Sequence, residues 1–229
     1  MNNMYDQQEF PRSSDFPVEN TESKGFSIRD MIDTVREFWD DTKELFQDVV
    51  NDFKGEKPSE YHLKDTIKAA EKIFTPEVIQ NWGQMPYEQR EQMIRDYAKG
   101  VANALGINYN GVEFGDLIAK EGAIGYNNGD GVVHLDYNFI YNPALLMKLI
   151  DTVAHEEFHQ FQTEAMMTPE KFNVDEATIT EWIAGDAFYT YDNPTAYDPW
   201  GYFYNPLETG ARHYGESVVR ELTKDLINA

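Results

Sequence analysis

The chain has 229 residues, of which 41% are hydrophobic and 14% aromatic, a composition typical of a packed globule rather than a disordered chain. Lys and Arg number 19 and Asp and Glu number 41, so the formal net charge is −22. This charge argues against nucleic acid and anionic membrane surfaces as partners, because both need a basic patch. The absence of cysteine excludes disulfides and thiolate ligands, which leaves histidine and carboxylates as metal ligands.

The first residues predict neither a signal peptide nor a membrane anchor. Residues 1–25 are polar and lack the basic and apolar regions of a signal peptide, so we expect a flexible N-terminus. No apolar run approaches the 18 residues that a membrane span requires, so we expect no membrane span. The expected location is the cytoplasm, or the exterior if a leaderless route exports the protein.

Residues 26–74 predict a helical extension. Ser27 and Asp30 have the spacing of a capping box, and apolar residues follow at helical spacing, so a helix is expected over 27–54. A second helix is expected over 59–74. This extension could pack on the rest of the chain, mediate self-association, dock a partner through the 27–54 helix, or serve an export signal. The sequence leaves these alternatives open.

Residues 75–229 predict a separate domain of helices and a small sheet. Thr75-Pro76 is typical of a helix start, and a longer helix is expected over 87–105, closed by Gly106. Three candidate strands follow, at 112–118, 123–126 and 132–136. The residues between the last two, NNGDG, indicate a hairpin turn. We therefore expect a short antiparallel sheet whose edge could bind a peptide as an added strand.

The next predicted helix carries the strongest functional signal. It is expected to begin at Asn142-Pro143, an N-cap residue followed by proline. Within it, His155 and His159 are four residues apart, so both imidazoles project from one face and can reach one ion. Glu156 lies about 100° around the helix, near enough to take a proton from a water on the metal. This is the H-E-x-x-H signature of zinc peptidases, on the helix that the motif requires.

The third ligand is ambiguous from spacing alone. A helix is expected over 171–182, then an aromatic loop over 188–204, then a last helix that begins at Asn205-Pro206. The extended H-E-x-x-H-x-x-G-x-x-H spacing is absent, so a carboxylate must serve. Glu181 and Glu208 are the two candidates, although Glu208 could instead be part of a capping box with Asn205.

A family resemblance favours Glu208. The runs VAHEEFHQ, FNV, YNPLE and ARHYG, within about Thr75 to Gly215, resemble small zincin-like metallopeptidases of Gram-positive bacteria and their phages. In that family the glutamate of an N-P-x-E-x-x-A-R element is the expected third ligand, and Glu208 matches it. The chain departs from the family at Thr209-Gly210, where a branched apolar residue and an acid are usual. Residues 1–74 have no counterpart in the family.

The resemblance and the motif together predict an α+β fold: a mostly helical, zincin-like metallopeptidase domain with a small antiparallel sheet before the H-E-x-x-H helix. We expect one Zn²⁺ per chain on His155, His159 and Glu208, and a peptide or protein substrate. Glu156 would be the general base for the attacking water. His213 or Tyr214, close after the third ligand, could donate to the oxyanion. The alternative is a toxin-like or partner-binding module with narrow or absent peptidase activity.

Overall fold

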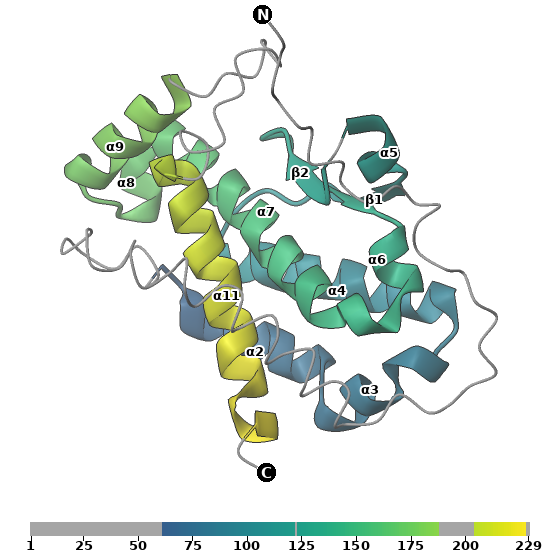
Figure 1. Cartoon of the computed structure of the whole chain (residues 1–229). Coiled ribbons are helices and arrows are strands. Elements are labelled where there is room, and N and C mark those ends of the chain that lie inside the picture. The colour runs from purple at the N-terminus through teal and green to yellow at the C-terminus, as the bar shows by residue number, and fades with distance from the viewer. Residues whose placement is uncertain (1–60, 122, 188–203, 228–229) are drawn as a thin grey trace, which may run out of the picture.

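A 22-residue helix, α7 (Leu146–Met167), runs through the middle of the protein in this computed structural model (Figure 1). The structure describes residues 61–121, 123–187 and 204–227. The expected flexible N-terminus, most of the expected extension with its 27–54 helix, and the aromatic loop at 188–203 lie outside them. The described part is mostly helical with one three-stranded sheet, which confirms the α+β class. Whether this arrangement is that of a zincin stays a prediction.

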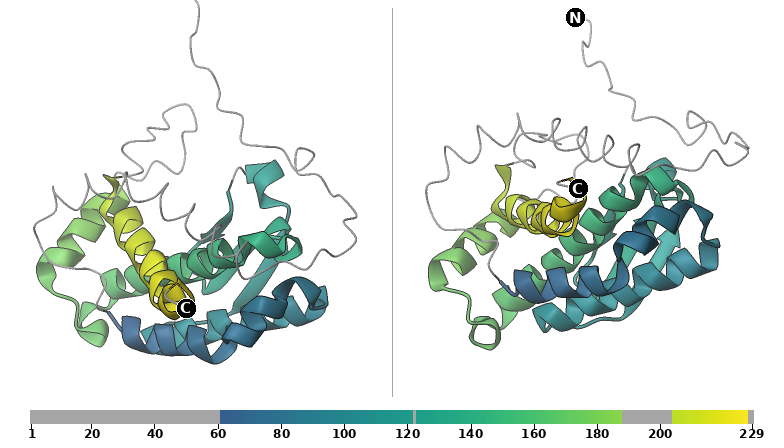
Figure 2. Two further views of the ribbon diagram at one scale, coloured as in Figure 1. Left: turned by 60° about the horizontal axis from the view of Figure 1, so that its bottom comes forward. Right: turned by 90° about the horizontal axis from the view of Figure 1, so that it is seen from below.

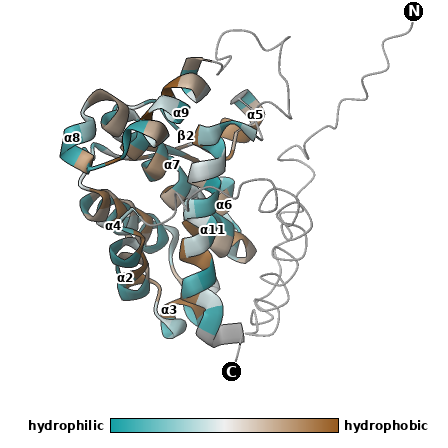
Figure 3. Cartoon of the chain, turned by 90° about the vertical axis from the view of Figure 1, so that its left-hand side faces the viewer, coloured by the Kyte–Doolittle hydropathy of each residue, from teal (hydrophilic) through white to brown (hydrophobic). Residues whose placement is uncertain are grey.

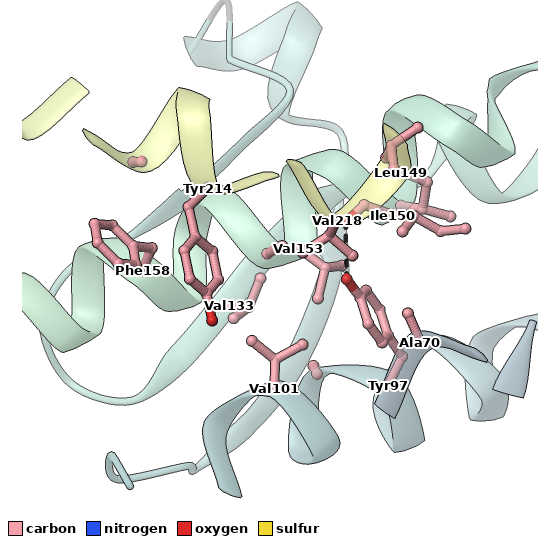
Figure 4. Packing of buried hydrophobic residues seen from close by; sticks show 14 of the residues in the cluster. Ala70, Tyr97, Val101, Val133, Leu149, Ile150, Val153, Phe158, Tyr214 and Val218 are labelled. Atoms are coloured by element: carbon pink, nitrogen blue, oxygen red, sulfur yellow. Dashed lines mark hydrogen bonds between the residues drawn. The ribbon is translucent and has the colours of Figure 1, made fainter. Parts of the chain in front are cut away.

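Four helices surround the hydrophobic core. Besides α7 they are α2 (Leu63–Ile73), α4 (Tyr87–Leu105) and α11 (Pro206–Ile227). α2 packs against α4 and α11, and α7 packs against the same two helices, so each contributes apolar side chains to a shared interior (Figure 4). α7 is buried around most of its circumference because these neighbours cover it, and its buried residues include acids and glutamines as well as apolar side chains.

The boundary expected between residues 74 and 75 does not separate two cores among the described residues. Ala70 and Phe74 are almost completely buried in the same core as the helices that follow. The Thr66 Oγ1 and Tyr214 Oη atoms are 2.6 Å apart and share a buried hydrogen bond across 148 residues of chain. α2 therefore packs on the main body, because its buried residues lie in that core.

The next two helices begin where the sequence predicts. α3 (Pro76–Asn81) starts with Thr75, whose Oγ1 accepts a hydrogen bond from the Val78 amide at 3.3 Å. A short 3₁₀ turn, η3 (Trp82–Gln84), leads into α4. α4 has the predicted bounds and ends at Gly106, whose φ of 71° is the left-handed conformation that glycine adopts at low cost.

The sheet is mixed, not antiparallel as predicted. Its strands are β1 (Gly111–Gly115), β2 (Gly125–Asn127) and β3 (Val132–Asp136), in the order β1-β3-β2. β2 and β3 form the expected antiparallel hairpin, but β1 pairs with β3 in parallel. The chain turns into α5 (Leu117–Glu121) where the first strand was expected to continue. The Asp136 carboxylate stabilises this turn by accepting hydrogen bonds from the amides of Leu117 and Ile118, each at 2.9 Å.

Short helical segments lie on both sides of α7. α6 (Asn138–Tyr141) and the 3₁₀ turn η4 (Pro143–Leu145) precede it, so α7 itself begins three residues after the predicted Asn142-Pro143 start. The Asn142 side chain still caps the turn by accepting a hydrogen bond from the Ala144 amide. After α7, the helix predicted over 171–182 is divided into α8 (Pro169–Phe172) and α9 (Glu176–Ala187), because Asn173 has a φ of 53° between them.

The smaller elements lie at opposite ends of the molecule, with α7 and α11 between them (Figure 1). α8 and α9 lie at one end, and the sheet and α5 lie at the other (Figure 1 and Figure 2). Hydrophilic and hydrophobic residues alternate along the surface helices, as expected where one face of a helix packs on the core (Figure 3). Within the described ranges, none of the helices combines the length and apolar character that crossing a membrane would require.

α7 and α11 approach each other closely because glycine lies at the crossing. A Cβ atom built on Gly215 would be 2.5 Å from Oδ1 and 2.7 Å from the backbone oxygen of Asp151, and one on Gly210 would be 3.1 Å from Nε2 of Gln162. Residue numbers fall along α7 as they rise along α11, so the helices cross in opposite directions. This contact places the first turn of α11 beside the middle of α7.

We predict that Gly215→Ala lowers the free energy of unfolding by about 1–3 kcal/mol, because the added methyl group must push the backbone of α7 away. Chemical denaturation of both proteins measures the change. Gly83→Ala is the matched control, since a Cβ there meets only Pro143 carbons at 3.4 Å. An equal loss of stability in the two variants would contradict the proposed tightness of the α7–α11 contact.

Candidate metal centre

Two histidines on one face of α7 form the base of the site. His155 and His159 are one helical turn apart, and their Nε2 atoms are 3.0 Å apart. Their rings are inclined by 81° with centroids 4.7 Å apart. Each side chain keeps 18% of its surface exposed. Two ring nitrogens therefore converge on a point that water or a small ion can reach.

A carboxylate from the first turn of α11 completes the cluster. Glu208 is 2% exposed, and its Oε2 lies 3.5 Å from Nε2 of His155 while its Oε1 lies 3.3 Å from Nε2 of His159. The rival candidate, Glu181, is exposed on α9 and does not join the cluster. The structure thus brings Glu208, and not Glu181, to the two histidines.

The residue before the proline of α11 explains why the carboxylate is held there. The Asn205 side chain accepts a hydrogen bond from the Leu207 amide at 2.9 Å, and its backbone oxygen accepts one from the Thr209 amide at 2.8 Å. Its Nδ2 also donates to the Gly185 oxygen in α9 at 3.0 Å. Asn205 therefore starts α11 and attaches it to α9, and the Glu208 carboxylate faces the histidines.

His159 and Glu208 form a buried ion pair within the cluster. Burial disfavours the charged form of His159, but the hydrogen bond and charge of Glu208 outweigh this effect and raise its pKa to about 9. Burial acts against the Glu208 carboxylate too, yet its hydrogen bonds to His155 and His159 hold its pKa well below the usual range. A cation is thus favoured at the point where the three side chains meet.

Glu156 lies beside the cluster without being part of it. The side chain is on α7 and 7% exposed, and burial raises its pKa although the charges of His155 and His159 act in the opposite direction. The nearby Glu208 carboxylate raises the pKa further. A carboxylate with a raised pKa is a better proton acceptor near neutral pH, which is the property that a general base needs.

The geometry of the three donors fits a metal ion. Ligands at 2.0–2.1 Å from a common tetrahedral ion would be about 3.4 Å apart, and the observed separations are 3.0, 3.3 and 3.5 Å. Two imidazole nitrogens and one carboxylate oxygen are donors that divalent transition metals accept. Among the described residues this is the one His, Asp and Glu group with such convergence. The cluster could therefore hold a metal ion.

A buried glutamine that the sequence did not identify contacts the cluster. Gln162 is fully buried on α7, and its Oε1 lies 2.9 Å from Nδ1 of His159. Its Nε2 donates to the Leu207 backbone oxygen, the residue before Glu208, at 3.1 Å. The sequence contains no signal for Gln162, because a glutamine three residues after the second histidine is not part of a known motif. Its contact with Leu207 exists only because α7 and α11 cross at this point.

Tyr214, one of two candidate oxyanion donors, points into the core. Its hydroxyl shares the buried hydrogen bond with Thr66, and its ring stacks on Phe158 with centroids 4.5 Å apart (Figure 4). The side chain is fully buried. The structure therefore places the Tyr214 hydroxyl in the core, since Tyr214 lies six positions after Glu208 and so on another face of α11.

The other candidate donor, His213, has a different environment from the cluster. Burial and the charges of Arg212 and Arg220 lower its pKa, and none of these groups is a candidate ligand. Its role as an oxyanion donor stays a prediction. His134 lies on β3, where its ring stacks on Tyr126 with centroids 4.3 Å apart, and it is not a member of the cluster.

Two further buried acids lie where α7 and α11 cross, beyond the cluster. Asp151 is 3% exposed and Glu216 is 6% exposed. Lys148 Nζ contacts Asp151 Oδ2 at 2.6 Å. Burial and the charge of Asp151 raise the pKa of Glu216 to about 8. Glu216 therefore carries a proton at neutral pH in the folded protein.

Comparison of the chain with protein-family models, with curated proteins and with solved structures found no match. The chemistry of the site is accordingly inferred from its own geometry.

We predict that Glu208→Gln lowers the affinity for Zn²⁺ by at least tenfold, because a neutral amide replaces the one anionic ligand. Glu181→Gln is the matched control and should bind as the wild type does. Competition with a chromogenic chelator measures both affinities, and elemental analysis gives the zinc content. Zinc lost in Glu181→Gln but kept in Glu208→Gln would overturn the ligand assignment.

We predict that Glu216→Gln flattens the pH dependence of stability. The folded pKa of about 8 exceeds the ordinary value of 4.5, so the folded protein holds a proton that the unfolded chain releases. Stability should fall as pH rises through this window, by at most about 1.4 kcal/mol per pH unit, and the variant should lose that slope. Denaturation of metal-free protein between pH 5 and 8 measures it, with the exposed Glu71→Gln as control. An unchanged slope in Glu216→Gln would contradict the prediction.

Proposed function

We propose that this protein is a zinc-dependent peptidase with a zincin-like arrangement, which hydrolyses peptide bonds with Glu156 as general base. The observation that carries the proposal is the convergence of His155, His159 and Glu208 immediately beside the buried Glu156. A structural metal site needs no such base, and it is usually closed by four protein ligands. Three protein ligands next to a base are typical of a catalytic site.

The ligand set favours zinc. Two imidazoles and one carboxylate, without a thiolate, are the protein ligands of several zinc hydrolases, which keep a further position for water or substrate. A bound zinc ion would polarise the scissile carbonyl and lower the pKa of water at the site. The two histidines stay partly exposed, so a substrate has access to the side of the cluster that faces solvent.

The protein's own contribution to the reaction is proton transfer by Glu156. As a carboxylate it accepts a proton from the attacking water, and it later passes that proton to the amine that leaves. Its buried position beside the ligands supports this role, because burial raises its pKa toward neutrality. Its neighbour Glu157 cannot share the task, since it is fully buried on another face of α7.

The sheet supports a peptide as substrate. β2 is one of the two edge strands of the described sheet, with β3 on its inner side, and it lies alongside α7. A Cβ built on Gly125 of β2 would be 2.8 Å from Cγ2 of Thr152, one turn before His155. An extended peptide that adds to β2 as a strand would therefore run along the helix that carries the ligands.

We predict that Glu156→Gln lowers the rate of peptide hydrolysis by about 10²–10⁴-fold while zinc content stays near one per chain, because a general base contributes that much. Hydrolysis is measured by mass spectrometry on a mixture of short synthetic peptides, and zinc by elemental analysis.

Glu157→Gln is the matched control for this experiment. Burial raises the pKa of Glu157 to about 9, so the acid is already neutral at pH 7 and the amide replaces it with little change. Its activity should remain close to that of the wild type. Cleavage that persists in Glu156→Gln would remove Glu156 from the mechanism. Zinc binding without cleavage of any peptide by the wild type would favour the partner-binding alternative.

A further inference from the structure

The amide of Gln162 joins a candidate ligand on α7 to the backbone of α11. The hydrogen bond from its Nε2 to the Leu207 oxygen fixes which way the amide is turned, because a carbonyl oxygen can only accept. The other end, Oε1, then lies 2.9 Å from Nδ1 of His159. Since an amide oxygen also only accepts, the Nδ1 atom of His159 must be the donor.

This orientation selects the chemical form of the histidine. Facing Glu208, Nε2 of His159 donates a proton to the carboxylate; a metal ion would replace that proton, and the one left on Nδ1 would make His159 a neutral imidazole with the Nε2 lone pair toward the ion. The distances of 3.0 and 3.3 Å from that Nε2 atom show that it faces the cluster. The form held by Gln162 is therefore the one that can bind a metal through Nε2 without tautomer exchange.

Gln162 also links the two helices that supply the ligands. Leu207, its acceptor, directly precedes Glu208, so the same amide that orients His159 holds the first turn of α11. Gly210 leaves the room for it, because a Cβ there would be 3.1 Å from Nε2 of Gln162. The glycine that departs from the family pattern thus lies against this amide.

We propose that Gln162 is a positioning residue of the metal centre: it holds the Nδ1–H form of His159 and places Glu208 opposite it, which raises the affinity for zinc. The proposal rests on the proposed zinc site but not on peptidase activity. Partners that orient a ligating histidine typically contribute about 10–100-fold in metal affinity.

The chain offers a closely matched control, Gln160. It is also on α7 and is 1% exposed, and its amide likewise joins α7 to other groups. Its Oε1 accepts from the Gly131 amide at 3.0 Å, and its Nε2 donates to Glu164 at 2.9 Å. Gln160 therefore shares burial, helix and residue type with Gln162, but its side-chain hydrogen bonds go to Gly131, Gly129 and Glu164 and not to a candidate ligand.

The test compares Gln162→Leu, Gln162→Glu and Gln160→Leu with the wild type. Zinc affinity is measured by chelator competition, and ¹⁵N NMR follows the Nδ1–H group of His159 in zinc-loaded and metal-free protein. The chain has five histidines, so this assignment is tractable. Gln162→Leu should weaken zinc binding by about 10–100-fold and lose the protected Nδ1–H signal, because the acceptor is gone.

The conservative variant separates positioning from packing. Gln162→Glu keeps an acceptor for Nδ1–H, so it should retain the signal and bind zinc more tightly than Gln162→Leu. Gln160→Leu should match the wild type in both measurements. If Gln162→Leu fails to fold, Gln162→Glu still decides, since loss of its Nδ1–H signal would overturn the proposal.

Three further results would also overturn it: zinc affinity of Gln162→Leu within about twofold of the wild type, an unchanged Nδ1–H signal in that variant, or an equal loss of affinity in Gln160→Leu. Failure of the proposed function gives a different result. If the wild type hydrolyses no peptide, the zinc affinities still test Gln162. If it binds no zinc, protection of the Nδ1–H proton from exchange in metal-free protein still tests the hydrogen bond between Gln162 and His159, because that bond does not depend on whether Nε2 carries a proton.

Discussion

The close crossing of α7 and α11 is the contact on which the candidate site depends. The two histidines come from the middle of α7, but the carboxylate comes from the first turn of a helix about fifty residues later in the chain. Glycine at positions 210 and 215 lets the backbones approach, and Asn205 fixes where α11 begins. Without this approach, Glu208 would be one more acid at a helix start, where acids are common for local electrostatic reasons.

The burial of charged groups is the second constraint. The buried acids near the α7–α11 crossing are stabilised in different ways. The charged cluster is stable because opposite charges face one another, which is the condition for burying ions at acceptable cost. Glu164 accepts hydrogen bonds from Gln160 and the Asn108 amide and pairs with Lys171. Glu157 has no hydrogen-bond partner among the described residues, and burial keeps it protonated instead. Adjacent glutamates, Glu156 and Glu157, therefore have different surroundings: the charges of His155 and His159 partly offset the effect of burial on the pKa of Glu156, whereas only burial and other acids act on Glu157.

Local signals predicted the helices well and the sheet less well. Periodic apolar residues and a glycine stop gave the bounds of α4, because helix formation depends on neighbours a few residues apart in the chain. The NNGDG turn likewise predicted the β2–β3 hairpin. The parallel pairing of β1 with β3 was not predicted. α5 and β2 lie between these two strands in the chain, so no pattern of neighbouring residues indicates that they pair. The same reason explains why the sequence left open whether the 59–74 helix packs on the rest of the chain, whereas the structure places α2 against the core.

The sequence by itself determined the candidate ligands on one helix and their spacing, because the 3.6-residue period places His155 and His159 on the same face whatever surrounds them. For the third candidate ligand, the spacing left Glu181 and Glu208 as alternatives, and a family resemblance favoured Glu208. Only the tertiary structure brought Glu208 to the histidines, placed the Tyr214 hydroxyl in the core and gave Gln162 partners on two helices. These outcomes depend on which faces of α7 and α11 meet, and that is set by packing between residues far apart in the chain.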